Sequence, residues 1–285
     1  MSYEETTFGF ACGGEWLCGV ASVPDQPAAR GVLVVVGGPQ YRAGSHRQFT
    51  LLARSLAGQG IAAMRFDYRG MGDSDGAMRD FADVGADLRC AVDQFFTQVP
   101  GLREVVIWGL CDGASAALFY AGGDARVTGL VLLNPWVRTS EGLAKATLKH
   151  YYRGRLLEAG LWKKILSGRF DFLGAARSFA RLLGAALAGG KPGDGAARQA
   201  APAALPDRMR AGLERYEGKV LLIISGADLT AQEFLDMAKA SSTWQRLLAA
   251  PRVTRHTIAE ADHTFSRRAW RDQVAGWTGD WVRSW

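Results

Sequence analysis

The stretch that decides the fold is Val105-Val106-Ile107-Trp108-Gly109-Leu110-Cys111-Asp112-Gly113-Ala114-Ser115-Ala116. It reads as an apolar strand, a turn bounded by two glycines and a helix of small residues. The turn has the G-x-S-x-G spacing of a nucleophile elbow, with Cys111 in the place of the serine. In so tight a turn, a Cβ atom at Gly109 or Gly113 would collide with the neighbouring chain. The pattern predicts an exposed thiol at the first turn of a helix, where the dipole and free N–H groups favour a thiolate.

The glycine spacing alone has low specificity, because the chain contains 35 glycines. The alternative is an ordinary strand–helix turn that holds a buried structural cysteine, since free cysteine is usually buried and inert. The strand before the turn and the helix after it are the context that the motif requires. They favour the nucleophile over the structural cysteine.

Length, charge and cysteine usage set outer limits on the protein. A chain of 285 residues accommodates one large domain or a domain with an insertion. The net charge of +6 favours anionic partners, but no nucleic-acid motif accompanies it, so we expect no nucleic-acid partner. The cysteines show neither a CxxC pair nor a metal-ligand spacing, so we expect a thiol-reducing cytoplasm, no metal and no cofactor.

Two further expectations concern targeting. The acidic start of the chain, Met1-Ser2-Tyr3-Glu4-Glu5, lacks the hydrophobic region of a signal peptide. No apolar run reaches the roughly 18 residues of a membrane span. We therefore expect a cytoplasmic protein without a transmembrane segment.

Strand-like apolar runs alternate with helical patterns along most of the chain. This alternation predicts a mostly parallel eight-stranded sheet with helices on both faces, opened by an antiparallel hairpin. The predicted strands are 6–11, 16–23, 31–36, 61–66, the run from 105, 127–133, 219–225 and 253–259. The predicted helices are 49–59, 81–99, 234–248 and a tryptophan-rich helix at the end of the chain.

Residues 136–218 interrupt this alternation with a helical, basic pattern. We interpret them as a helical cap inserted into a core made of residues 1–135 and 219–285. A Gly/Ala/Pro-rich segment near 186–206 predicts mobility within the cap. The basic charge is either a solvated helical face or a surface that attracts an anionic carrier or a membrane leaflet.

A thiol nucleophile needs a base, and the base needs an orienting carboxylate. His263 follows the last predicted strand, so it lies at the same carboxyl edge of the sheet as Cys111. His256 lies inside that strand, and we interpret it as structural. The carboxylate that suits this arrangement best is Asp228, which follows the strand after the predicted cap.

Two neighbouring positions are less suitable for the carboxylate. Asp262 is adjacent to His263 and would hardly reach the far nitrogen of that ring. The position after the preceding strand is Asn134, which cannot carry the charge. We therefore predict a catalytic triad of Cys111, Asp228 and His263.

The loop Gly37-Gly38-Pro39-Gln40 follows a buried strand and has two interpretations. A phosphate cradle is disfavoured, because neither GK[ST] nor GxGxxG accompanies the loop. The other interpretation is a loop that supplies an N–H group to an oxyanion hole. Pro39 has no N–H, so we predict Gly38 and Asp112 as the two backbone donors. Such donors each typically lower a barrier by about 3–4 kcal/mol.

Polar residues just after this loop are candidate substrate contacts. We predict Gln40, Arg42 and His46 as substrate contacts. Arg42, His46 and Arg47 could bind an anionic group of the substrate; the alternative for this segment is a solvated helix start. In the later loop around Asp67 and Arg69, an EF-hand spacing is absent, so we expect these two residues to tie the loop together instead of binding a metal.

The motifs together resemble the α/β-hydrolase superfamily over almost the whole chain. The specific marks are Phe66-Asp67-Tyr68-Arg69-Gly70-Met71-Gly72-Asp73-Ser74, the elbow, Asp228 and Ala261-Asp262-His263-Thr264-Phe265. The order Cys111, Asp228, His263 is the nucleophile–acid–base order of that superfamily. The resemblance implies an α/β-hydrolase fold.

A narrower resemblance is carried by residues 37–49 together with 109–113. These segments are similar to the first type of exosortase A system-associated hydrolases, which are encoded alongside bacterial exopolysaccharide and protein-sorting genes. The resemblance implies a cytoplasmic bacterial protein. The chain departs from the wider superfamily in two ways: it has cysteine at the elbow, and no histidine precedes Gly37-Gly38. Cysteine at the elbow is also found in dienelactone hydrolases and polyhydroxyalkanoate synthases.

These inferences lead to three functional hypotheses. The first is hydrolysis of a small-molecule ester or thioester through an acyl-cysteine. One form of this hypothesis has the acyl group attached to coenzyme A or acyl carrier protein. The second is acyl transfer to an alcohol or sugar through the same acyl-enzyme. The third is a non-catalytic module of an assembly complex. Peripheral membrane contact through the basic cap is an additional expectation.

Overall fold

The computed structural model describes residues 2–38, 40–137 and 204–285. Residues Met1–Trp136 and Pro206–Trp285 form one compact unit, and the description below concerns that unit. The predicted cap at 136–218 and its predicted mobile segment at 186–206 lie mostly outside the described residues. Both stay predictions.

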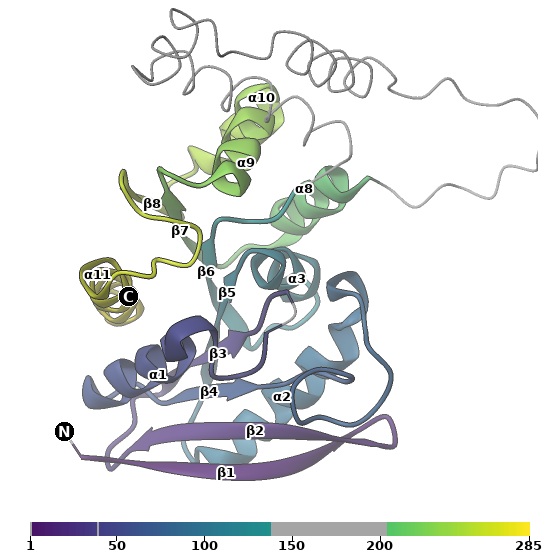
Figure 1. The fold of residues 1–285 in the computed structure, drawn as a ribbon, viewed down its shortest axis with the longest axis vertical. Helices are drawn as coiled ribbons and strands as arrows, with labels where there is room; N and C mark the ends of the chain where they lie inside the picture. Colours follow the sequence, from purple (N-terminus) through teal and green to yellow (C-terminus); the bar gives the residue numbers. More distant parts are fainter. Residues whose placement is uncertain (1, 39, 138–203) are drawn as a thin grey trace, which may run out of the picture. The chain divides into compact units, whose positions relative to one another are not determined.

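An eight-stranded sheet runs through this unit in the order β1-β2-β4-β3-β5-β6-β7-β8 (Figure 1). The opening hairpin β1–β2 and the β2–β4 pair are antiparallel, and every other neighbouring pair is parallel. The predicted mostly parallel eight-stranded sheet is therefore confirmed. The strands are β1 Tyr3–Cys12, β2 Glu15–Pro24, β3 Arg30–Val35, β4 Ala63–Phe66, β5 Glu104–Leu110, β6 Val127–Leu133, β7 Lys219–Ser225 and β8 Val253–Ile258.

Helices cover both faces of the sheet (Figure 1). This is why the central strands β3, β5, β6 and β7 are buried almost throughout and read as unbroken apolar runs. On one face lie α1 Gln48–Gly58 and α11 Arg268–Arg283, and on the other lie α2 Gly85–Gln98, α3 Asp112–Ala121 and α8 Leu205–Arg215. The remaining helices are η1 Ser45–Arg47, η2 Phe81–Asp83, α9 Leu229–Lys239 and α10 Ser242–Leu248.

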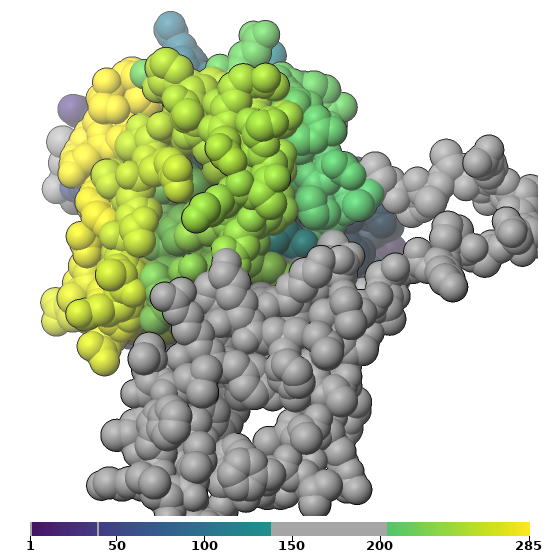
Figure 2. All heavy atoms as spheres, turned by 90° about the horizontal axis from the view of Figure 1, so that it is seen from above, coloured from purple at the N-terminus to yellow at the C-terminus, as the bar shows by residue number. Residues whose placement is uncertain are grey.

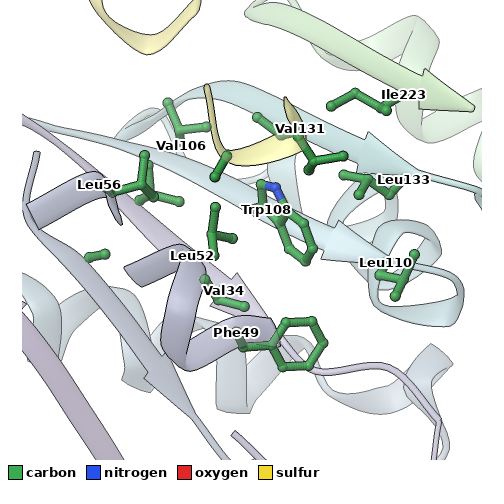
Figure 3. Close-up of a cluster of buried hydrophobic side chains, with 14 of the residues drawn as sticks. Val34, Phe49, Leu52, Leu56, Val106, Trp108, Leu110, Val131, Leu133 and Ile223 are labelled. Carbon is green, nitrogen blue, oxygen red and sulfur yellow. The ribbon is translucent and has the colours of Figure 1, made fainter. Parts of the chain in front are cut away.

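The core between the sheet and α1 fixes the strand that carries the elbow (Figure 3). Val106, Trp108 and Leu110 alternate along β5 and belong to this cluster. The Trp108 ring meets the edge of Phe49 from α1, with the ring centroids 5.6 Å apart and the planes at 74°. Because both rings are buried, they fix the position of β5 against α1 at the residue directly before the Gly109–Gly113 turn.

The end of the chain is anchored to the same core, and α9, α10 and α11 contribute much of the face in Figure 2, in light green to yellow. Trp281 is buried and meets the ring of Trp285 at 5.5 Å. The Arg30 guanidinium lies 3.5 Å from the centroid of Trp285 and also pairs with Glu104 at 2.6 Å. Part of the tryptophan-rich helix is therefore core.

Two helix predictions need correction. The predicted helix 234–248 is two helices, because Ser241 lies in extended backbone and its side chain accepts the N–H of Trp244 as an N-cap. The predicted helix 81–99 is divided in the same way, since Val84 departs from helical geometry between η2 and α2. Both predictions followed apolar periodicity, which continues across such a break.

Buried charge pairs hold the loop after β4. Asp87 on α2 is fully buried and accepts hydrogen bonds of 2.9 Å from Nε and Nη2 of Arg69. Asp67 instead accepts the backbone N–H and a guanidinium N–H of Arg42. The expectation that Asp67 and Arg69 tie this loop is met through separate partners. Among residues that the structure describes, no cluster of acidic, histidine and cysteine side chains could hold a metal.

We predict that Gly109→Ala destabilises the protein and that Gly85→Ala does not. A Cβ at Gly109 would lie 2.5 Å from the backbone carbon and oxygen of Gly113, whereas one at Gly85 meets no heavy atom within 4 Å. Overpacking of this kind typically costs about 1–3 kcal/mol. Urea denaturation should show the loss for Gly109→Ala alone; equal midpoints for the two variants would contradict the steric account.

Candidate active site

The turn between β5 and α3 has the strained geometry that the sequence predicts. Cys111 adopts φ 61° and ψ −125°, and α3 begins with the next residue. The Cys111 N–H donates to the carbonyl oxygen of Leu133 at 2.8 Å, which ties the turn to the end of β6. A Cβ at Gly113 would lie 2.7 Å from the carbonyl oxygen of Val35, so the helix packs closely against β3. The half-buried Cys111 is therefore held at the carboxyl edge of the sheet.

The structure brings the predicted base and acid together. Nδ1 of His263 lies 2.7 Å from Oδ2 of Asp228. Asp228 is also the N-cap of α9, where its carboxylate accepts the N–H groups of Thr230 and Ala231 at 3.1 Å each. The carboxylate is 8% exposed. These contacts fix its orientation toward the imidazole.

His263 also faces the thiol of Cys111. Burial alone would lower the pKa of His263, but hydrogen bonds to Asp228 and to Cys111 raise that pKa to about 10. The imidazole is therefore protonated at neutral pH. A protonated imidazole at this position can give a proton to a leaving group.

The two N–H groups predicted for an oxyanion hole lie around the Asp112 side chain. Its carboxylate accepts the backbone N–H of Gly113 at 3.0 Å and lies close to the N–H groups of Gly38 and of Asp112 itself. The contact is close, because a Cβ at Gly37 would lie 2.3 Å from Oδ1 of Asp112. Burial raises the pKa of the Asp112 carboxyl despite these donors. In this conformation a carboxylate lies beside the donors that the sequence assigns to an oxyanion.

The three predicted substrate contacts have different surroundings. Arg42 pairs with Asp67 and with Asp73, the latter at 2.7 Å, so its charge is already neutralised within the loop. Oε1 of Gln40 accepts the N–H of Ser45 at 3.4 Å, which is also a contact within the loop. His46 is exposed and has a positive φ of 52°.

Asn134 has a role that the sequence analysis missed. It is fully buried, and its Nδ2 donates to Oγ of Ser225 at 2.8 Å and to the carbonyl oxygen of His263 at 2.9 Å. Its Oδ1 accepts the N–H of Ser225 at 2.8 Å. Asn134 therefore joins the ends of β6 and β7 to the histidine loop. The available signal was a polar residue at the end of a buried strand, which the sequence analysis considered only as a possible acid.

The residues set aside as catalytic candidates are engaged elsewhere. The Asp262 carboxylate accepts the N–H of Ser266 at 2.9 Å. The ring of His256 stacks on Trp277, with centroids 4.3 Å apart and planes at 17°. None of the helices within the described ranges combines the length and apolarity that a membrane span requires.

Solved structures with similar folds cover nearly the whole chain at low sequence identity. The esterase Pf2001 of Pyrococcus furiosus superposes with a TM-score of 0.66 at 16% identity, over 99% of this chain and 92% of the esterase. A dienelactone hydrolase from Anabaena variabilis gives 0.62 at 16% identity, with 98% and 96% covered. A putative hydrolase from Agrobacterium vitis gives 0.58 at 17% identity, with 99% and 100% covered. These similarities show a shared fold.

A search of curated proteins found no match. The model of the family described as Serine aminopeptidase, S33, matches residues 27–169, which is half of the chain. That range includes the Gly37-Gly38 loop and the elbow, where this chain has Cys111 in place of the serine of the family's description. By its matching residues and its fold, the chain belongs to the serine aminopeptidase S33 family of the α/β-hydrolase superfamily.

Proposed function

We propose that this protein hydrolyses an ester or thioester through an acyl-cysteine intermediate on Cys111. The observation that carries the proposal is the contact of 2.7 Å between Nδ1 of His263 and Oδ2 of Asp228, together with the proximity of Cys111 to the same imidazole. A thiol, an imidazole and an orienting carboxylate are the three groups that nucleophilic catalysis of acyl transfer requires.

The proposed reaction has two steps. In the first, the proton of the Cys111 thiol passes to His263, the sulfur attacks the acyl carbon, the bond to the leaving alcohol or thiol breaks, and His263 gives that group the proton. In the second, water attacks the thioester while His263 takes a proton from it, the bond from carbon to sulfur breaks, and the acid leaves as His263 returns the proton to the sulfur. Asp228 holds the imidazole in the orientation that both proton transfers need.

The substrate class follows from the chemistry of the nucleophile and from related folds. An esterase and a dienelactone hydrolase are among the proteins with similar structures, which supports an ester bond as the target. A thioester on coenzyme A or acyl carrier protein stays a proposal, because the basic segment that motivates it lies mostly outside the described residues. The exosortase-associated resemblance, with the bacterial and cytoplasmic setting that it implies, also stays a proposal.

Asp112 imposes a further requirement on this mechanism. An oxyanion and an ionised carboxylate cannot share the N–H of Gly38, since both are negative and need the same donor. The carboxylate must therefore become protonated or turn away before the tetrahedral intermediate forms. Burial raises the pKa of Asp112, which brings the neutral form closer to working pH.

We predict that Cys111→Ala lowers kcat on a p-nitrophenyl acyl ester by about 10³-fold or more, because the covalent route is lost. Intact-mass analysis of the wild type should show an acyl adduct on Cys111 during turnover. Cys18→Ala is the matched control, since Cys18 is also a half-buried free thiol. Full turnover by Cys111→Ala would exclude the mechanism, and transfer to an added alcohol instead of water would identify an acyltransferase.

We predict that His263 makes the free energy of unfolding fall as the pH becomes alkaline. Its folded pKa of about 10 lies above the ordinary 6.5, so the folded protein binds this proton more tightly than the unfolded chain. The stabilisation is complete below pH 6.5 and is lost as the pH rises through about 10. Between neutral pH and pH about 10, the free energy of unfolding of the wild type should therefore fall by about 1 kcal/mol or more relative to that of His263→Gln. One pKa unit corresponds to about 1.4 kcal/mol. The same difference in unfolding free energy between the wild type and His263→Gln at every pH would contradict this account.

We predict that Asp112→Asn raises kcat/KM above pH 7 by about tenfold, which corresponds to about 1.4 kcal/mol of barrier. The amide keeps the size of the carboxyl group but removes the charge that competes with the oxyanion. The advantage should shrink at low pH, where wild-type Asp112 becomes neutral. Asp83→Asn, on the exposed surface of η2, is the control for lost negative charge. A fall in kcat/KM for Asp112→Asn at all pH values would instead show that the carboxylate is needed to hold the loop.

A further inference from the structure

A cavity of about 450 Å³ lies between η2, the first half of α2, the second half of α3 and the start of α8. None of its lining residues belongs to the proposed catalytic set. Ala116 is the lining residue nearest to Cys111 along α3, and it lies more than one helical turn beyond it. From Ala116 the lining continues along α3 and past its end to Gly123, away from the elbow. The cavity is formed by a separate set of side chains from the catalytic groups.

Aromatic rings and small side chains form the apolar part of this cavity. Phe81 and Phe119 stack with their centroids 6.3 Å apart and their planes at 20°. The neighbouring lining positions Ala82, Ala86 and Ala116 carry only methyl groups, which leaves the hollow open. Such a surface buries an apolar chain or ring of a ligand.

Two guanidinium groups line the same cavity. Arg208 lies over Phe119, with its central carbon 4.3 Å from the ring centroid, and its Nη2 donates to the carbonyl oxygen of Ala82 at 3.1 Å. These contacts orient the charge without neutralising it, because neither partner is an anion. Arg89 is exposed and forms no ion pair with any residue in the described part of the chain.

No carboxylate of the described residues lines the cavity to balance these charges. The hydroxyl of Tyr120 donates to Asp124 at 2.5 Å, so this polar group of the lining is already engaged. An arginine next to an aromatic wall is suited to a planar or multi-oxygen anion, which takes several N–H donors at once. The charge of the cavity is therefore complementary to an anion, and its walls are complementary to an apolar body.

We propose that this cavity binds one amphiphilic anion, namely a carboxylate or phosphate monoester attached to an apolar chain or ring. Arg89 and Arg208 receive the anionic group, and Phe81 and Phe119 cover the apolar body. The volume lies within the range of roughly 300–1,000 Å³ that is typical of small-molecule sites. The proposal stands apart from the proposed hydrolysis, because no catalytic residue takes part in it.

Isothermal titration calorimetry of the full chain tests the proposal with four probes. Octanoate and octyl phosphate carry the two anionic groups, octyl glucoside has a neutral head, and inorganic phosphate has no apolar body. We expect one site for at least one octyl anion, with affinity about tenfold above that for either control probe. Tighter binding of octyl phosphate assigns phosphate monoesters, and tighter binding of octanoate assigns carboxylates. Equal binding of octyl glucoside, or no binding of either octyl anion at millimolar concentration, overturns the proposal.

Variants then locate the site. Arg89→Gln combined with Arg208→Gln should weaken binding about tenfold or more, since the guanidinium groups supply the charge-assisted hydrogen bonds. Ala86→Phe should abolish it by filling the hollow from an exposed helical position that tolerates a larger side chain. Arg255→Gln on the exposed face of β8 is the matched control and should bind as wild type does.

Cys111→Ala separates this proposal from the proposed hydrolysis. We expect it to bind the octyl anion with unchanged affinity, because the readout is heat of binding and needs no turnover. Loss of binding in Cys111→Ala, or unchanged binding in the double arginine variant, would place the anion elsewhere and overturn the assignment.

Discussion

The close approach of α3 to β3 and β5 is the constraint on which the remaining structure depends. Cys111 occupies a positive-φ conformation that a non-glycine residue adopts only when its surroundings enforce it. Those surroundings are the missing side chains at Gly109 and Gly113, the buried register of β5, and the hydrogen bond from the Cys111 N–H to the end of β6. This backbone conformation places the Cys111 thiol outside the core, at the carboxyl edge of the sheet where the loops of Asp228 and His263 also lie.

That convergence is stabilised by polar contacts beneath the catalytic groups. Asn134 connects the ends of β6 and β7 to the backbone of His263, and Asp228 is fixed as the cap of α9 before it meets the imidazole. Asn134 is fully buried and the Asp228 side chain is 8% exposed, so the orientation of the ring is set by groups with little access to water. The contacts with Asn134 and Asp228 thus fix the position of His263, although this residue lies on a loop.

Charged side chains have different roles in three parts of the described structure. Arg42 forms ion pairs with Asp67 and Asp73, and Arg69 forms one with Asp87. These ion pairs hold the loop after β4 in place. Asp112 is a negative charge held by backbone N–H groups where a reaction intermediate would need them. Arg208 and Arg89 are positive charges beside a cavity that has no acid in its lining. A ligand could supply the missing counter-charge beside Arg208 and Arg89, and an oxyanion would need the donors beside Asp112.

The sequence by itself determined the sheet, the order of its parallel strands along the chain, the elbow, and the pairing of His263 with Asp228. These depend on continuous apolar runs, on glycine spacing, and on the rule that parallel strands end at one edge, all of which are local or topological. Only the tertiary structure decided the division of 234–248 at Ser241, the role of Asn134, the neutralisation of Arg42, and the position of the Asp112 carboxylate over the Gly38 N–H. Each of these depends on which atoms from distant segments come within hydrogen-bonding distance, and neither residue type nor spacing specifies that distance.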